Sequence, residues 1–369
     1  MMKPYSNRLA AALAAVFFLS ATLPAMSNQG PKPVVVTPTV DERIAFYSQK
    51  LKKHPTLFAV YPQLAAAYLD KARATNDVKW LQLAEANLHK SMQIQPNFEA
   101  YKIFAALYDY RHRFTEARKW GEKAEAADPT DTQVKALLVE ADLGLGDMDT
   151  AMKRLPPLDS APPDFFTAVA MATVLKAQQR YDEARVAYLK AEQFALEQYV
   201  TYLAVWARTN AAGMLIDSQQ AAMALPDLEA ASTMQKDNRE LRRHWAEYYS
   251  AQGETARALE IVEALIKEAP HPSYHRQAHV LARKLGDAKA AQHHFAAAEK
   301  SYRLALKAKE IYPLGALAQL YCDADTRLDE ALALARRNFS YKKDKEATDV
   351  LACVNSKMEQ NKMEQKKKT

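Results

Sequence analysis

Apolar side chains recur along the chain at the spacing of an amphipathic helix. Tyr101, Phe104, Ala105 and Tyr108 follow an i, i+3, i+4, i+7 pattern, which places all four on one face of a helix. A second stripe follows after a short polar break; its members are Phe114, Ala117, Gly121 and Ala124, with Pro129 just beyond them. The pattern predicts two helices joined by a short turn, that is, a helical hairpin.

This hairpin pattern returns at a period close to 34 residues. The stretch RFTEARKWGEKAEAADP at 113–129 has a near echo in RYDEARVAYLKAEQFAL at 180–196, with a weaker version between them. The matching columns of the other clear copies are Leu138, Val139, Ala151, Leu155 and Leu158; Ala168, Met171, Ala172, Leu175, Tyr181, Ala184, Tyr188 and Ala191; and Trp245, Ala246, Tyr249, Gly253, Ala258, Val262, Leu265 and Pro270. Copies in phase predict an array of stacked hairpins.

Other stretches fit the pattern with changes of length. Residues 61–96 look like a first repeat with two longer helices, and 199–238 requires an insertion around Gly213. A longer helix is expected through 292–310, and 346–357 resembles the first helix of a hairpin that lacks its second.

The order of large, small, aromatic and proline positions resembles the tetratricopeptide repeat, whose period is also 34. The resemblance covers roughly residues 46–356 and suggests an exported bacterial protein of this type. It implies an all-α fold, a right-handed superhelical solenoid of helical hairpins, because one repeat cannot bury its apolar face without neighbours. It also implies a concave groove, lined mainly by the first helices, that holds an extended peptide or a helix of a partner protein.

The groove positions of the family carry a mixed and then basic set of side chains in this chain. The mapped residues are Lys102, Asp109, Tyr110, Lys176, Arg243, Glu247, Arg276, Arg283 and Lys284. We therefore expect a partner segment that carries carboxylates. One subclass of the family holds a free C-terminal carboxylate with lysines and an asparagine. The asparagine column here reads Ala106, Glu140, Thr173, Glu247 and Val280, so that clamp is not expected.

The N-terminus has the features of a secretory signal. MMKPYSNR carries Lys3 and Arg8, an apolar run follows, and AMS at 25–27 offers small residues for cleavage. We expect a signal peptide at 1–27, with cleavage after Ala25 or retention as an uncleaved anchor as alternatives. Because no cysteine lies near the junction, a lipid-modified N-terminus is not expected. The mature chain is expected in the periplasm or secreted.

The rest of the chain divides into three expected parts. Residues 28–45 are expected to be an extended linker, 46–356 the solenoid, and 357–369 a basic disordered tail.

Composition narrows the function classes. The 369 residues are 49% hydrophobic and 25% charged with only eight glycines, which favours helices over sheets and phosphate-cradling loops. The net charge of +6 falls to 6 − 2 = +4 when Lys3 and Arg8 are removed, and the surplus is spread along the chain except at 342–345 and 362–369. Nucleic acid is therefore not expected as a partner.

The two cysteines lie about one repeat apart. Cys322 and Cys353 fall on adjacent first helices near the same height, so an exported chain is expected to join them in a disulfide. The alternative is two buried thiols that pack as small apolar side chains.

Five of the nine histidines fall between His271 and His294. His275 and His279 have the spacing by which two imidazoles share a metal, and His293 lies on the second helix of the same hairpin. No acid or cysteine completes a motif, so a structural role is expected. A periplasmic metal-binding accessory protein that uses these three histidines is the alternative function.

Signatures of catalysis are missing from the sequence. It contains no GxSxG, no HExxH and no phosphate-binding glycine loop, and LGLGDMD at 143–149 is interpreted as a turn between helices. We therefore expect no enzyme activity and no cofactor. The expected function is a scaffold in cell-envelope assembly, export or secretion; an accessory domain that needs a separate catalytic partner is a weaker alternative.

Overall fold

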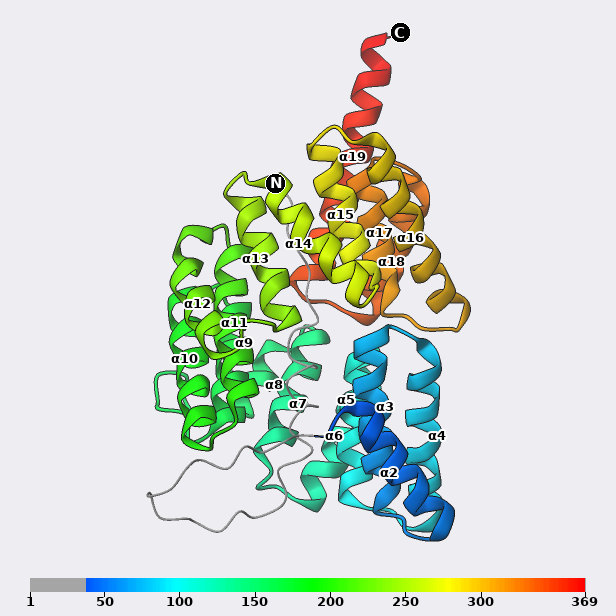
Figure 1. Cartoon of the computed structure of the whole chain (residues 1–369), viewed down its shortest axis with the longest axis vertical. Coiled ribbons are helices and arrows are strands. Elements are labelled where there is room, and N and C mark those ends of the chain that lie inside the picture. The colour runs from blue at the N-terminus through cyan, green and yellow to red at the C-terminus, as the bar shows by residue number, and fades with distance from the viewer. Residues whose placement is uncertain (1–37, 369) are drawn as a thin grey trace.

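The computed structural model describes residues 38–368, and every regular element within them is an α-helix (Figure 1). The helices are α2 (Val40–Lys53), α3 (Val60–Thr75), α4 (Val78–Ile94), α5 (Phe98–Tyr110), α6 (Phe114–Ala127), α7 (Thr132–Gly144), α8 (Met148–Lys153), α9 (Phe165–Ala177), α10 (Tyr181–Glu197), α11 (Thr201–Asp217), α12 (Ala221–Met234), α13 (Arg239–Ala251), α14 (Thr255–Glu268), α15 (Pro272–Lys284), α16 (Ala288–Lys307), α17 (Pro313–Ala324), α18 (Leu328–Tyr341) and α19 (Lys345–Lys368).

Consecutive helices pair as hairpins, and each hairpin packs on the next. The pairs are α3 with α4, α5 with α6, α7 with α8, α9 with α10, α11 with α12, α13 with α14, α15 with α16 and α17 with α18. The array curves from α2–α4 through α9–α12 to α15–α19, as the colours of Figure 1 show. This arrangement confirms the predicted all-α solenoid of helical hairpins.

The turns inside the hairpins preserve the repeat. A residue with positive φ ends the first helix of each of the eight hairpins, at Asn76, His112, Gly146, Gln179, Gln219, Gly253, Gly286 and Asp325. The intervals are 36, 34, 33, 40, 34, 33 and 39 residues. A left-handed residue at this position satisfies the last carbonyls of the helix and reverses the chain. Five of the eight positions are not glycine, which is one reason why so few glycines suffice.

The long interval between Gln179 and Gln219 contains the insertion that the sequence placed near Gly213. Helix α10 has 17 residues and α11 also has 17, whereas the corresponding α6 and α5 have 14 and 13. The extra residues are thus shared by two adjacent helices, so the neighbouring hairpins lengthen together and stay packed.

Small residues at the helix crossings let the helices approach closely. Ala105 and Ala117 are buried, as the repeat pattern predicts. A Cβ added to Gly121 would lie 2.7 Å from Leu138 Cδ2, so the next hairpin occupies the space where a side chain would be. The glycine and alanine positions of the pattern are therefore packing positions.

Three boundaries differ from the prediction. Helix α2 begins at Val40 inside the expected linker, because Thr39 and Glu42 form a reciprocal capping box. Helix α19 continues through Lys368, where a disordered tail was expected, since residues 357–368 contain no proline or glycine and are mostly strong helix formers. Helix α8 has only six residues, because prolines at 156, 157, 162 and 163 end it early. The expected signal peptide at 1–27 lies outside the described residues.

Candidate functional site

The two ends of the array meet, which the sequence did not predict. Arg111, after α5, donates to both carboxylate oxygens of Glu310, after α16, with Nε–Oε2 and Nη2–Oε1 distances of 2.8 and 2.6 Å. Arg111 Nη1 also donates to Glu85 on α4 at 2.7 Å. The backbone N–H of Lys343 donates to the carbonyl of Gly144 at 2.8 Å. We call these contacts between the two ends the seam.

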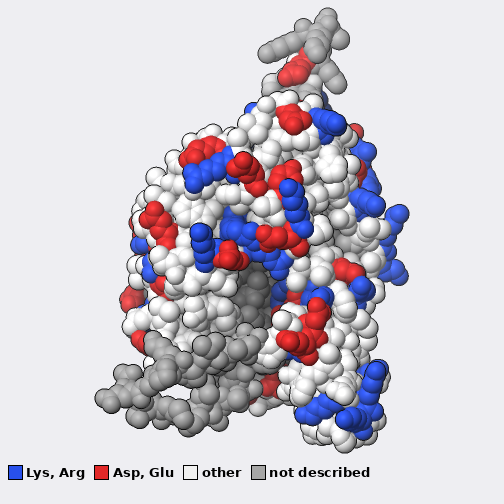
Figure 2. Space-filling model, in the orientation of Figure 1, with Lys and Arg blue, Asp and Glu red and all other residues white. Residues whose placement is uncertain are grey.

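The seam converts the concave side of the array into a cavity of about 580 Å³. Residues of α3, α5, α11, α13, α15, α16, α18 and α19, and of the segment from Tyr312 through α17, line it. In Figure 2, charged side chains of both signs are interspersed around the hollow at the centre of the face shown. The predicted groove is therefore a chamber bounded by first helices on most sides.

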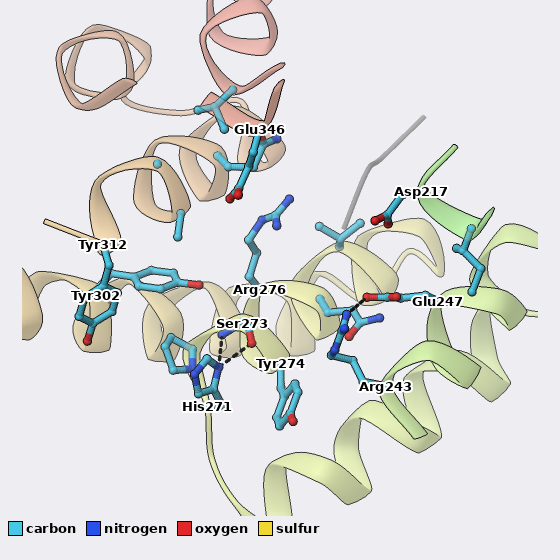
Figure 3. Close-up of a pocket in the computed structure, with 18 of the residues that line it drawn as sticks. Asp217, Arg243, Glu247, His271, Ser273, Tyr274, Arg276, Tyr302, Tyr312 and Glu346 are labelled. Atoms are coloured by element: carbon cyan, nitrogen blue, oxygen red, sulfur yellow. Dashed lines mark hydrogen bonds and ion pairs between the residues drawn. The ribbon is translucent and has the colours of Figure 1, made fainter. Parts of the chain in front are cut away.

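The wall formed by α13 holds a buried network of ion pairs. Arg243 pairs with Glu240 and Glu247, and His244 Nδ1 lies 2.7 Å from Glu247 Oε2. Burial alone would raise the pKa of Glu240, but the charge of Arg243 and the hydrogen bonds from His244 and Arg243 hold it well below its usual value. Figure 3 shows Arg243 and Glu247 joined at one side of the cavity. These charges are already matched within the protein.

The wall formed by α15 begins with His271, which caps the helix by accepting from the backbone N–H of Ser273 at 3.2 Å. Burial lowers the pKa of His271 to about 4, so the imidazole is neutral at neutral pH. Arg276 Nε donates to Asp323 Oδ2 on α17 at 2.6 Å, which ties two neighbouring first helices together. In Figure 3 the Arg276 side chain extends from α15 into the space below Glu346.

The α5 and α7 side of the seam gathers buried ionisable groups. Lys342 is buried, pairs with Asp344 and Glu346, and interacts electrostatically with Asp109 and Glu140. Burial raises the pKa of Glu140 to about 7 and raises that of Asp109 well above its usual value. One oxygen of each carboxyl is buried without a hydrogen-bond partner among the described residues. Both groups therefore favour the protonated form more than exposed carboxyls do.

Five of the nine groove residues predicted from the sequence line the cavity, and four do not. Those that line it are Tyr110, Arg243, Glu247, Arg276 and Lys284.

Of the other four, Lys102 is buried in an ion pair with Asp131 at 2.7 Å, and Asp109 is buried near Glu140. Lys176 is half-buried, and Arg283 is exposed and donates to the carbonyl of Asp323. The nine predicted groove residues therefore lie in several different environments.

Sequence reasoning missed the residues that join the cavity at the seam. Arg73, Tyr302, Tyr312 and Lys342 all line it, although three of them lie outside the first helices. The family pattern gave no signal for Tyr302, Tyr312 and Lys342, because they join the cavity only when the array closes. Arg73 could have been found, since it stands in the same column of the repeat as Asp109, Lys176 and Arg283.

The histidines between His271 and His294 do not make the pairs that the metal-site hypothesis expects. His275 Nδ1 lies 3.0 Å from His294 Nδ1, whose Nε2 lies 2.8 Å from Glu263 Oε1. His279 instead contacts the Ala291 carbonyl through Nδ1 at 2.8 Å, and His293 is exposed. Among the residues that the structure describes, no three His, Cys, Asp or Glu side chains are placed to hold a metal ion together.

The expected disulfide between Cys322 and Cys353 is confirmed. It joins α17 to α19, with a Cα–Cα distance of 6.4 Å. The bridge fixes the last helix, which has no hairpin partner, to the hairpin before it. Across residues 38–368, no helix is sufficiently long and apolar to cross a bilayer.

No family model and no curated protein sequence matches this chain. Similar solved structures include the human IFIT1 dimer with m7Gppp-AAAA, with 16% identity, 84% of this chain and 75% of that chain covered, and a TM-score of 0.44. The Cut9–Hcn1 hetero-tetramer of APC/C is 13% identical, with 86% of this chain and 67% of that chain covered and a TM-score of 0.43. A tetratricopeptide repeat protein from Parabacteroides merdae is 14% identical, with 84% of this chain and 98% of that chain covered and a TM-score of 0.42. These distant similarities do not indicate what this chain binds.

Proposed function

We propose that this chain is a helical-repeat scaffold of the tetratricopeptide type that binds an extended segment of a protein partner inside the central cavity. The single observation that carries the proposal is the cavity itself, about 580 Å³, with walls from several first helices and a seam that closes it. Its volume falls within the range of about 300–1,000 Å³ that is usual for ligand sites. A chamber of this size accommodates a few residues of a chain and excludes a folded domain.

The walls of the cavity combine polar side chains with a larger apolar surface, a mixture that suits a peptide. Arginine, tyrosine, histidine, glutamine and asparagine side chains all line the cavity. An extended peptide carries an N–H donor and a carbonyl acceptor on almost every residue, so it can bond to such a surface along its whole length.

We propose further that the protein acts outside the cytoplasm, in the periplasm or after secretion. The Cys322–Cys353 disulfide supports this location, since disulfides form and persist in oxidising compartments. The signal-like sequence at 1–27 supports it independently. Envelope assembly, export and secretion are the processes in which such a scaffold would act.

The test is capture of partners from periplasmic extract, read by mass spectrometry, with a cavity variant and a matched outer variant. Lys284→Glu reverses an exposed charge that lines the cavity. Within the described part of the chain, Lys284 Nζ donates one hydrogen bond, to Ser250 Oγ at 3.3 Å. Lys289→Glu makes the same change at an exposed position outside the cavity. We expect Lys284→Glu to lower the yield of specific partners and Lys289→Glu to leave it unchanged. Equal losses would show that general surface charge attracts the partners.

A further inference from the structure

We propose that the seam end of the cavity is a carboxylate-binding subsite centred on Arg73, which takes a carboxylate of the bound peptide. The proposal rests on the proposed function, because it names the group that the bound segment presents at this end. Arg73 stands outside the asparagine column described above.

Arg73 is a guanidinium with donors to spare. It lines the cavity near the end of α3, and its side chain is only 12% exposed. Nη1 reaches Asp70 Oδ1 at 3.3 Å, whereas Nε and Nη2 are buried and have no hydrogen-bond partner among the described residues. Buried donors without acceptors are costly, and more so on a charged group. An oxygen ligand at this position would remove that cost.

The one carboxylate that contacts Arg73 is shared. Asp70 Oδ2 accepts from Arg43 Nη2 at 2.7 Å, which is shorter than its contact with Arg73. Asp109 lies close enough to interact electrostatically with Arg73 and makes no hydrogen bond to it. Glu310 is taken up by Arg111. Of the carboxylates around Arg73, one is therefore shared with Arg43, one makes no hydrogen bond to Arg73, and one is bonded to Arg111.

Aromatic hydroxyls complete the donor set. The Arg73 Cζ lies 5.2 Å from the ring centre of Tyr110, and Tyr110 lies 6.0 Å from Tyr312 across the seam. Tyr302 lines the same cavity, and Figure 3 shows it beside Tyr312. The hydroxyls of these three tyrosines make no hydrogen bond to another described residue. Of the three, Tyr110 and Tyr312 are linked to Arg73 through these ring contacts, and their hydroxyls can donate to a carboxylate oxygen.

The spacing along α17 indicates that the carboxylate belongs to a peptide. Tyr312 caps α17, and Gln319 lies seven residues later, about 10 Å along the helix axis. Gln319 is buried and lines the cavity; its Nε2 donates to Asp323 Oδ1 at 2.7 Å, whereas its Oε1 has no partner among the described residues. An extended chain covers that length in about three residues. A carboxylate that accepts from the Tyr312 hydroxyl and a backbone N–H three residues away would satisfy Tyr312 and Gln319 together.

The experiment uses the full mature chain and libraries of nonapeptides that differ only in having Glu or Gln, or Asp or Asn, at one position. Glutarate serves as a free dicarboxylate in a second arm. We expect acidic pools to bind at least about ten-fold more tightly than their amide counterparts, as expected for charge-assisted hydrogen bonds. Arg73→Met should abolish that preference, and Tyr312→Phe should reduce it by about three-fold or more.

Lys71→Met is the matched control, because it removes the same charge two positions away, where Lys71 pairs with Asp41 at 2.7 Å outside the cavity. The melting temperature of the unliganded protein distinguishes a binding role from a structural one. Since two donors of Arg73 are unsatisfied and Asp70 keeps its ion pair with Arg43, Arg73→Met should change the melting temperature little while the preference for acidic peptides is lost. A lower melting temperature with unchanged peptide preference would overturn the proposal.

The outcomes separate this subsite from the proposed function. Peptides that bind without a preference for acids, or with a preference that survives Arg73→Met, would overturn the subsite and leave the proposed function standing. A second outcome is that no peptide pool binds but glutarate stabilises the wild type and not Arg73→Met. That result would retain the subsite and overturn the peptide-binding function. If neither probe binds, both proposals fail.

Discussion

Replacement of Glu310 by glutamine tests how the array is closed. The change keeps the size of the side chain but removes its charge and one of the two acceptors that Arg111 uses. Glu310 is 1% exposed and Arg111 is 8% exposed, so the pair is screened little by water. Loss of one partner from a buried ion pair costs about 3–5 kcal/mol.

A third residue, Glu85, offsets part of that cost. Glu85 still accepts from Arg111 Nη1 at 2.7 Å, and it is 25% exposed. We therefore expect a cost just below that range, about 2–3 kcal/mol, which is a change of about 30- to 150-fold in an equilibrium constant. Because Arg111 and Glu310 are 199 residues apart, the loss acts on closure of the array and leaves the packing within each hairpin intact.

Small-angle X-ray scattering measures closure directly, and urea unfolding measures the energy. We expect a larger radius of gyration and a lower urea midpoint for Glu310→Gln. The control is Glu330→Gln, which weakens an ion pair with Arg303 whose members are 40% and 42% exposed, and should cost about 0–1 kcal/mol. Arg111→Met combined with Glu310→Leu should recover much of the loss, because both charges of the buried pair are removed together. Glu85 loses Arg111 but is 25% exposed and keeps the hydrogen bond from the Tyr108 hydroxyl. Unchanged scattering with a loss of unfolding free energy below about 0.5 kcal/mol would refute this account of the seam.

The other predictions concern the core, the buried acid, the disulfide and export. Ala117→Leu should lower stability by about 1–3 kcal/mol in thermal melts followed by circular dichroism, because the buried crossing has no room for extra methylenes; an unchanged melt would mean that the crossing is not tight. Burial raises the pKa of Glu140 to about 7, so its contribution to stability is lost as the pH rises through that value. Glu140→Gln should therefore gain stability relative to the wild type between pH 5 and pH 8, and parallel melting curves at both pH values would contradict this. Cys322→Ala should cost about 3–4 kcal/mol in urea unfolding, since the bridge closes a loop with a sequence separation of 31; an equal midpoint for oxidised and reduced wild type would argue against it. Intact-mass measurement of the native protein should find Asn28 as the first residue, and a full-length species would overturn the expected cleavage.

The sequence alone determined the hairpins and their order. Helical periodicity depends on side chains three or four positions apart, so Phe104, Ala117 and Gly121 could be assigned to packing faces without a structure. The Cys322–Cys353 bridge followed from the same repeat, since residues one period apart lie at the same height on adjacent first helices.

Boundaries were less certain, because local signals compete there. The prolines after α8 shorten a helix that the repeat pattern extends, and the Thr39 capping box starts α2 within an expected linker. At both places a short-range interaction of the backbone overrides the periodic pattern.

Only the tertiary structure decided that the array closes. Small rotations between successive hairpins accumulate along a solenoid, and no single repeat records whether their sum brings the ends together. The pairing of Arg111 with Glu310, and the meeting of Tyr110 with Tyr312, are products of that sum. The sequence therefore placed Arg243 and Arg276 near a groove, whereas the cavity and the unsatisfied donors of Arg73 emerge only when both ends are in place.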